Sequence, residues 1–99
     1  MVKLPAPRVI AVDVDGTLID SRRRISASVV SLIRDQSADG WDVIVWSMRG
    51  RKYAQAAANA AGVADLVVCV GKPSVIVDDV GLSWLKGARV IGGHRGARR

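Results

Sequence analysis

The feature that most constrains this chain is a short apolar run at positions 9–14, Val-Ile-Ala-Val-Asp-Val. A nearly continuous run of β-branched and small residues is typical of a strand covered on both faces, as in a parallel sheet. Gly16 then interrupts the run. Further short apolar runs predict additional strands at residues 43–46, 66–70, 75–77 and 88–91.

Helical patterns lie between these runs. Ser26 is a suitable N-cap for a helix over residues 27–38, where apolar residues recur with helical spacing. The alanine-rich stretch at 51–61 predicts a second helix that Gly62 ends, and a short helix is expected at 82–86. Strands that alternate with helices predict an α/β fold built on a parallel sheet.

Length and composition favour one domain. The chain has 99 residues, of which 49% are hydrophobic and 24% charged, which suits one core and excludes a disordered chain. We expect this domain to span residues 1–91, followed by a basic, flexible tail at 92–99. No apolar run approaches the ~20 residues of a membrane span, and residues 1–8 lack a signal core, so a cytoplasmic location without a membrane partner is expected.

The single cysteine and the single histidine argue against two kinds of site. Cys69 has no second cysteine for an internal disulfide and, within an apolar run, is expected to be a small buried residue. His94 stands alone in the Gly/Arg-rich tail. A zinc site of the Cys/His kind is therefore excluded.

The strongest local motif is Asp13-Val-Asp-Gly-Thr17 at the end of the first predicted strand. Ligands of parallel sheets bind beyond the carboxyl ends of the strands, which is where these carboxylates fall. Side chains two apart on a strand share a face, so Asp13 and Asp15 can converge if the chain stays extended. Taken singly, an Asp at a strand end is more often a turn residue.

Three further segments follow predicted strands and carry reactive side chains. Ser47 and Arg49 follow the second strand, Lys72 follows the third, and Asp78 with Asp79 follows the fourth. Phosphoryl transfer needs such a set: a nucleophile, a cation, and donors around oxygens that carry spread negative charge.

This ordered series resembles the haloacid dehalogenase-like phosphohydrolase superfamily, whose motifs run Asp-x-Asp-Gly-Thr, strand-end Ser or Thr, Lys and acid pair. Response-regulator receivers use similar residue types in a different chain order. The resemblance implies a Rossmann-like parallel sheet flanked by helices. Because no long insert separates the motifs, it also implies a minimal member without a cap domain, with only a flap after Leu18.

The resemblance implies specific catalytic roles. Asp13 would be the nucleophile that forms an aspartyl-phosphate, and Asp15 the general acid and base. Asp13, Asp15 through its carbonyl, Asp78 and Asp79 would hold Mg²⁺, a hard cation that prefers oxygen ligands.

Four other residues would hold the phosphoryl group. Ser47 would bind it through its hydroxyl, Lys72 would neutralise both it and Asp13, and Thr17 would brace the turn. Arg49 could bind further phosphate oxygens as a fork or lie on the surface.

The spacing around Lys72 conflicts with the predicted strands. A parallel strand pair needs a crossover of about a dozen residues or more, but only residues 71–74 separate the runs at 66–70 and 75–77. One of these two predicted strands must therefore be wrong or displaced. The conflict concerns the position of the lysine rather than the carboxylates.

The chain is basic, with a net charge of +6. Arg22, Arg23, Arg24, Arg49 and the basic pair at 51–52 would ring the mouth of the site and attract a phosphorylated small molecule. They could equally contact a nucleic-acid backbone, or the arginine run could be a solvated turn.

The tryptophans could stack on bases but are expected instead to fill the core: Trp41, Trp46 and Trp84.

Three functions follow from these observations. The first is a Mg²⁺-dependent phosphomonoester hydrolase, either open or enclosed by a second subunit of a homo-oligomer. The second is a phosphatase of nucleic-acid ends, and the third is a non-catalytic binding module on the same scaffold.

Overall fold

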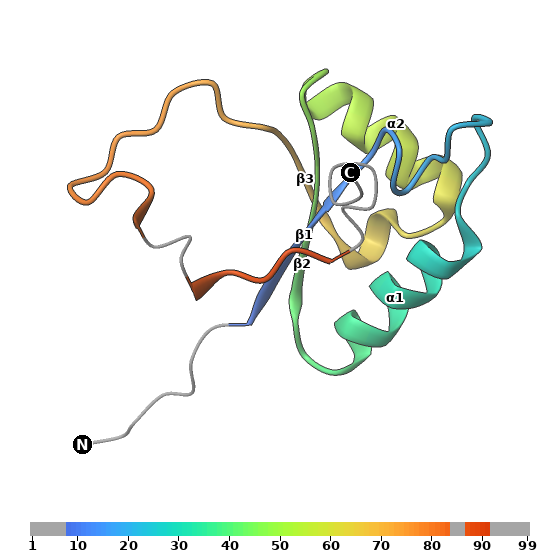
Figure 1. Cartoon of the computed structure of the whole chain (residues 1–99). Coiled ribbons are helices and arrows are strands. Elements are labelled where there is room, and N and C mark those ends of the chain that lie inside the picture. Colours follow the sequence, from blue (N-terminus) through green and yellow to red (C-terminus); the bar gives the residue numbers. More distant parts are fainter. Residues whose placement is uncertain (1–7, 84–86, 92–99) are drawn as a thin grey trace.

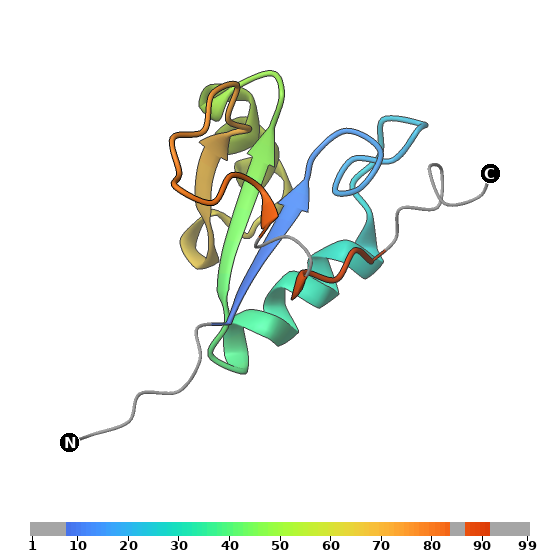
Figure 2. The ribbon, with the colours of Figure 1, turned by 60° about the vertical axis from the view of Figure 1, so that its left-hand side comes forward.

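A computed structural model describes residues 8–83 and 87–91 and shows an α/β fold (Figure 1). Three parallel strands form one sheet in the order β1-β2-β3, with their carboxyl ends at one edge (Figure 2). The elements are β1 (Val9–Asp13), α1 (Ala27–Ala38), β2 (Asp42–Ser47), α2 (Arg51–Ala61), the short 3₁₀ helix η1 (Ala64–Leu66) and β3 (Val68–Gly71). The predicted fold class and the helices at 27–38 and 51–61 are confirmed.

One face of the sheet carries the core. Val12 of β1 pairs in register with Val45 of β2, which pairs with Cys69 of β3, and all three are buried. Both α1 and α2 lie on this side of the sheet (Figure 1). The buried residues that form this core are Val12, Val14, Leu18, Ile33, Val43, Val45, Ala54, Ala57, Ala58, Val63 and Cys69.

The other face of the sheet is more open, which contradicts the prediction of strands covered on both faces. Val9 of β1 is 49% exposed and Val68 of β3 is 62% exposed. The strand order explains this difference. Two crossovers of the same hand that advance in the same direction across a sheet place both helices on the same face.

The start of α1 and the end of α2 lie where the sequence predicts. The Ser26 hydroxyl accepts a hydrogen bond from the Val29 backbone N–H (3.3 Å) and so caps α1. Helix α2 ends at Gly62, which takes a left-handed conformation (φ 73°). Because the inward side chains of α2 are alanines, this helix can lie close to β2 and β3.

The predicted strands at 75–77 and 88–91 are wrong. Neither segment forms a strand, and Val75 and Val77 are 79% and 96% exposed. Three residues between β3 and position 75 cannot form a parallel crossover. The strand expected at 66–70 lies instead at Val68–Gly71, because η1 occupies the residues before it. Part of the predicted helix at 82–86 lies outside the described residues.

The tryptophans of the described residues are not core residues. Trp41 and Trp46 are half-buried, and each lies beneath a cation, Arg8 and Lys72 respectively. Trp84 lies outside the described residues. Within the part of the chain that is described, no helix is long and apolar enough to cross a membrane.

Gly71 provides a test of how closely α2 approaches the sheet. A Cβ atom at Gly71 would lie 3.2 Å from the Gly50 Cα and 3.5 Å from the Arg51 backbone nitrogen. Because both neighbours are backbone atoms, we expect Gly71→Ala to lower the free energy of unfolding by about 1–3 kcal/mol. The measurement is urea denaturation. Gly87→Ala is the control, because a Cβ atom there meets nothing within 4 Å, and equal stability of both variants would contradict the prediction.

Candidate active site

The ends of the three strands bring three predicted site residues together. Asp13 ends β1, Ser47 ends β2, and Lys72 directly follows β3. The Lys72 backbone N–H donates to the Ser47 carbonyl oxygen (2.9 Å), continuing the sheet one residue beyond the strand. The Lys72 Nζ then lies 3.2 Å from Asp13 Oδ1 and 5.8 Å from the centre of the Trp46 ring. The hydrogen bond to Ser47 thus holds the Lys72 backbone at the strand ends.

Ser47 is buried at this edge, with only 3% of its surface exposed. Its Oγ accepts a hydrogen bond from the Arg49 backbone N–H (2.9 Å), which fixes the turn into α2. A hydroxyl that accepts one bond keeps its own hydrogen for donation. Ser47 therefore both shapes the turn and can supply a donor.

The Asp15 carboxylate is held by side chains from three parts of the chain. Tyr53 of α2 donates its O–H to Asp15 Oδ1 (2.7 Å), and Arg49 Nε lies 3.1 Å from Oδ2. Arg23 Nη1 lies 3.8 Å from Oδ1. The Arg49 guanidinium also lies over the Tyr53 ring, 5.0 Å from its centre. These contacts fix the orientation of a carboxylate that is 41% exposed.

The loop after β1 is anchored by the core. Leu18 is fully buried, and its backbone N–H donates to the Asp13 carbonyl oxygen (3.2 Å). Thr17 lies in the same turn, where its backbone N–H donates to the Val14 carbonyl oxygen (3.2 Å). Gly16 has a positive φ of 84°, which lets the chain reverse directly after Asp15. Backbone hydrogen bonds thus form the turn that contains Thr17.

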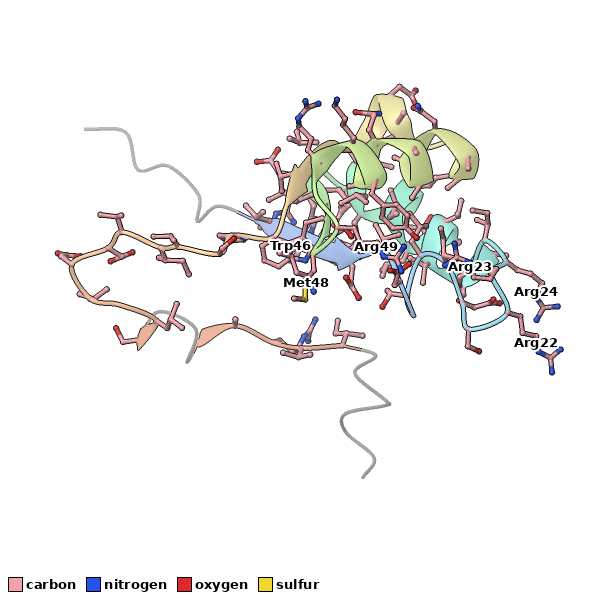
Figure 3. The ribbon with its side chains drawn as sticks, turned by 90° about the horizontal axis from the view of Figure 1, so that it is seen from above. Arg22, Arg23, Arg24, Trp46, Met48 and Arg49 are labelled. Atoms are coloured by element: carbon pink, nitrogen blue, oxygen red, sulfur yellow. The ribbon has the colours of Figure 1, made fainter. Side chains whose placement is uncertain are left out.

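The predicted flap is a tight hairpin at residues 20–24, here called the arginine hairpin. Asp20 Oδ1 accepts backbone N–H bonds from Arg22 (2.8 Å) and Arg24 (2.9 Å), and Asp20 Oδ2 lies 3.4 Å from Arg24 Nε. Arg22 and Arg24 point away from the body of the protein, while Arg23 lies on the side of Arg49 (Figure 3). Of the three arginines, Arg23 is the one that contacts Asp15.

An open pocket of about 320 Å³ lies between the arginine hairpin and the turn after β2. Its lining residues are Asp15, Gly16, Asp20, Ser21, Arg23 and Arg49. Two carboxylates and two guanidiniums therefore face a shared space beside the strand ends.

Comparison with known protein families matches residues 10–74 to haloacid dehalogenase-like hydrolases. The chain belongs to the haloacid dehalogenase-like hydrolase family. A phosphoglycolate phosphatase of Archaeoglobus fulgidus is 38% identical over 63 residues, which cover 64% of this chain and 27% of that protein. The chain thus spans about a quarter of the length of this relative. No solved structure matches the chain.

The stretch that matches the haloacid dehalogenase-like family contains Asp13, Asp15, Ser47 and Lys72 and ends before Asp78. The residues that the structure brings together at the strand ends therefore lie within the family match. The acid pair lies beyond it.

Asp78 and Asp79 are not gathered with the other predicted metal ligands. They lie in the exposed segment after β3, where Asp78 Oδ1 accepts the Val80 backbone N–H (3.0 Å). Among the described residues, no three Asp, Glu, His or Cys side chains lie close enough together to hold a metal ion. The oxygen ligands suit Mg²⁺ chemically, but this arrangement of them does not form a complete site.

Sequence reasoning missed two residues of the site, Tyr53 and Asp20. Tyr53 lies in the first turn of α2, immediately after the turn that carries Arg49, and this position was the available signal. For Asp20, the signal was an aspartate at the start of a polar turn, a position where the side chain often accepts backbone N–H bonds. Cys69 is buried as predicted, and burial raises the pKa of its thiol.

Asp20 gives the arginine hairpin a defined pH response. The backbone N–H of Arg24, with that of Arg22, lowers the pKa of the Asp20 carboxyl. Because the pKa of Asp20 is lowered, its carboxylate stabilises the hairpin fully at a pH above the ordinary aspartate pKa. This stabilisation is lost only as the pH falls through the lowered pKa. We therefore expect the Arg22 and Arg24 amide resonances to titrate together, with a midpoint below the usual Asp value of about 3.9.

The check is an NMR titration of the full chain with Asp20→Asn as the matched variant. Asn cannot ionise, so the two amides of that variant should show no common transition. Amides that titrate at or above the ordinary aspartate value in the wild type would contradict the assigned contacts.

Proposed function

We propose that this chain is a phosphomonoester hydrolase in which Asp13 attacks phosphorus. The observation that carries the proposal is the Lys72–Asp13 ion pair of 3.2 Å at the edge where three parallel strands end. A carboxylate beside a fixed ammonium is suited to meet a phosphoryl group, because the cation offsets the charge of both. The phosphatase relative from Archaeoglobus fulgidus supports the same reaction class.

The proposed reaction has two displacements at phosphorus. In the first, an Asp13 carboxylate oxygen forms a bond to phosphorus, the bond to the leaving oxygen breaks, and Asp15 gives that oxygen a proton. In the second, Asp15 takes a proton from water, and the water oxygen attacks phosphorus. The Asp13–phosphorus bond then breaks and inorganic phosphate leaves.

The surrounding side chains would stabilise the transferring phosphoryl group. Ser47 has a hydroxyl hydrogen to donate at the end of β2, and Lys72 supplies a positive charge. Arg49, which contacts Asp15, adds positive charge beside the strand ends, and the backbone of Thr17 helps to hold the turn after Asp13. Ser47 ends β2, and the other groups follow the strands on short connections.

We also propose Mg²⁺ as the cofactor, with Asp13, Asp15, Asp78 and Asp79 as its protein ligands. The support is the family to which the chain belongs and the oxygen chemistry of these residues. Bound Mg²⁺ would supply positive charge toward the phosphate oxygens. Gathering the four ligands would require the segment that carries the acid pair to move toward the strand ends, so no step above depends on the ion.

Replacement of the nucleophile tests the proposal. Asp13→Asn keeps the size of the side chain but removes the attacking carboxylate, so we expect kcat on phosphate monoesters to fall at least about a thousand-fold. The control is Asp42→Asn at the exposed start of β2, which makes the same chemical change away from the site.

The measurement is phosphate release from a panel of small phosphate esters, with oligonucleotide ends included because Arg22 and Arg24 point outward. An Asp13→Asn variant as active as Asp42→Asn would refute the assignment of Asp13. A wild type that releases phosphate from no substrate of the panel would refute the proposed activity.

Metal removal tests the cofactor separately. We expect chelation by EDTA to abolish phosphate release and Mg²⁺ to restore it, with the double variant Asp78→Asn/Asp79→Asn requiring at least about tenfold more Mg²⁺ because two charged ligands are lost. Activity that persists in EDTA would contradict the proposed cofactor. An unchanged Mg²⁺ requirement of the double variant would remove the acid pair from the proposed ligands.

A further inference from the structure

The charge around Asp15 is unbalanced. The Lys72–Asp13 pair is neutral, and so is the Arg24–Asp20 pair. Asp15, in contrast, is one carboxylate between two guanidiniums, those of Arg23 and Arg49. The side chains of these two arginines are 66% and 61% exposed, so the excess positive charge faces solvent.

The backbone of the arginine hairpin is built to place Arg23. Arg23 has a φ of 64°, in the left-handed region that residues other than glycine rarely adopt. The hairpin holds this conformation through the Arg23 N–H bond to the Asp20 carbonyl oxygen (2.9 Å) and through the two bonds that Asp20 Oδ1 accepts on either side of Arg23. A conformation that the surroundings must enforce indicates that the position of this side chain matters.

The pocket beside Asp15 lies on the side of the leaving group. In the proposed reaction, Asp15 gives its proton to the leaving oxygen, so the leaving group extends from Asp13 past Asp15. The pocket lined by Asp15, Arg23 and Arg49 occupies that side, whereas Asp13 and Lys72 do not line it. A leaving group placed there would meet both guanidiniums.

We infer that Arg23 and Arg49 bind a second anionic group of the substrate, carried on the leaving group. The substrate class is then small phosphate esters that carry a carboxylate or a second phosphate besides the phosphate that is hydrolysed. Guanidiniums recognise both groups through paired, charge-assisted hydrogen bonds. Asp20 is a positioning residue in this account, because it holds the backbone that presents Arg23. The inference rests on the proposed function, which sets the direction of the leaving group.

The same contacts couple substrate binding to Asp15. An anionic leaving group competes with the Asp15 carboxylate for Arg23 and Arg49, which now hold it at 3.8 and 3.1 Å. When these arginines turn to the substrate, Asp15 keeps the Tyr53 hydroxyl, 2.7 Å away, as its fixed partner. The Asp15 carboxyl group is then free to carry the proton that the leaving oxygen receives.

The test is calorimetric binding of phosphonates, which cannot be hydrolysed, to the full chain at constant free Mg²⁺. Phosphonoacetate carries a phosphonate and a carboxylate, methylphosphonate lacks the second anion, and methylenediphosphonate carries a second phosphonate in place of the carboxylate. We expect phosphonoacetate, methylenediphosphonate or both to bind at least about tenfold more tightly than methylphosphonate. A gain of this size is expected from a charge-assisted hydrogen bond to the second anionic group. Which probe gains identifies the second anion.

Matched variants assign the preference to its residues. Arg23→Gln should reduce the preference for the probes with a second anion, whereas Arg22→Gln, with the same charge change on the outward side of the hairpin, should keep the preference. Asp20→Ala should weaken the preference without removing a positive charge. In turnover, Arg23→Gln should raise KM for an ester with a second anion more than KM for an ester without it, whereas Arg22→Gln should change the two KM values alike.

The outcomes separate the two proposals. Methylphosphonate that binds as tightly as both other probes would overturn this inference and leave the proposed function standing. Equal losses in Arg22→Gln and Arg23→Gln would overturn it as well, because net charge alone would then explain the preference. If none of the phosphonates binds, the phosphate site itself fails, and this inference fails with it.

Discussion

The arrangement of this site depends on one backbone hydrogen bond, from the Lys72 N–H to the Ser47 carbonyl oxygen (2.9 Å). It extends the parallel pairing of β2 and β3 by one residue, so the lysine leaves the sheet at a fixed place. From there its ammonium lies over the Trp46 ring and reaches Asp13. Gly71 permits this geometry, because α2 begins so close to β3 that a side chain at this position would press on backbone.

In the proposed reaction, the site has two parts that meet different ends of a substrate. At the strand ends, sheet pairing holds the backbone of Asp13, Ser47 and Lys72. Beside them, Asp15 is held by side chains from a helix, a turn and the arginine hairpin, which are exposed and free to exchange partners. The sheet thus sets the backbone that carries Asp13, whereas the side chains around Asp15 lie largely on loops, which often carry specificity on a fixed scaffold.

Features that depend on local sequence pattern could be predicted from the sequence. Features that depend on how the chain connects one element to the next could not. Both helices follow from apolar spacing and capping residues, and the convergence of Asp13, Ser47 and Lys72 follows from the geometry of parallel strands. The segment at 75–77 has strand-forming residues but no path to a parallel position, so its propensity predicted the wrong structure. Tyr53 was missed because its hydrogen bond depends on how α2 meets the strand ends. The hydrogen bonds of Asp20 are local to the arginine hairpin, but how the hairpin places Arg23 against Asp15 depends on tertiary packing.

Trapping the phosphorylated chain would show whether Asp13 forms a bond to phosphorus. The wild type would be mixed with a phosphate ester that it hydrolyses and quenched in acid within one turnover. Its peptides would then be mapped by mass spectrometry. We expect one acid-stable, alkali-labile phosphoryl group on the peptide that contains Asp13, and no such group in Asp13→Asn. A phosphoryl group on another residue, or phosphate release from a chain that is never phosphorylated, would contradict it.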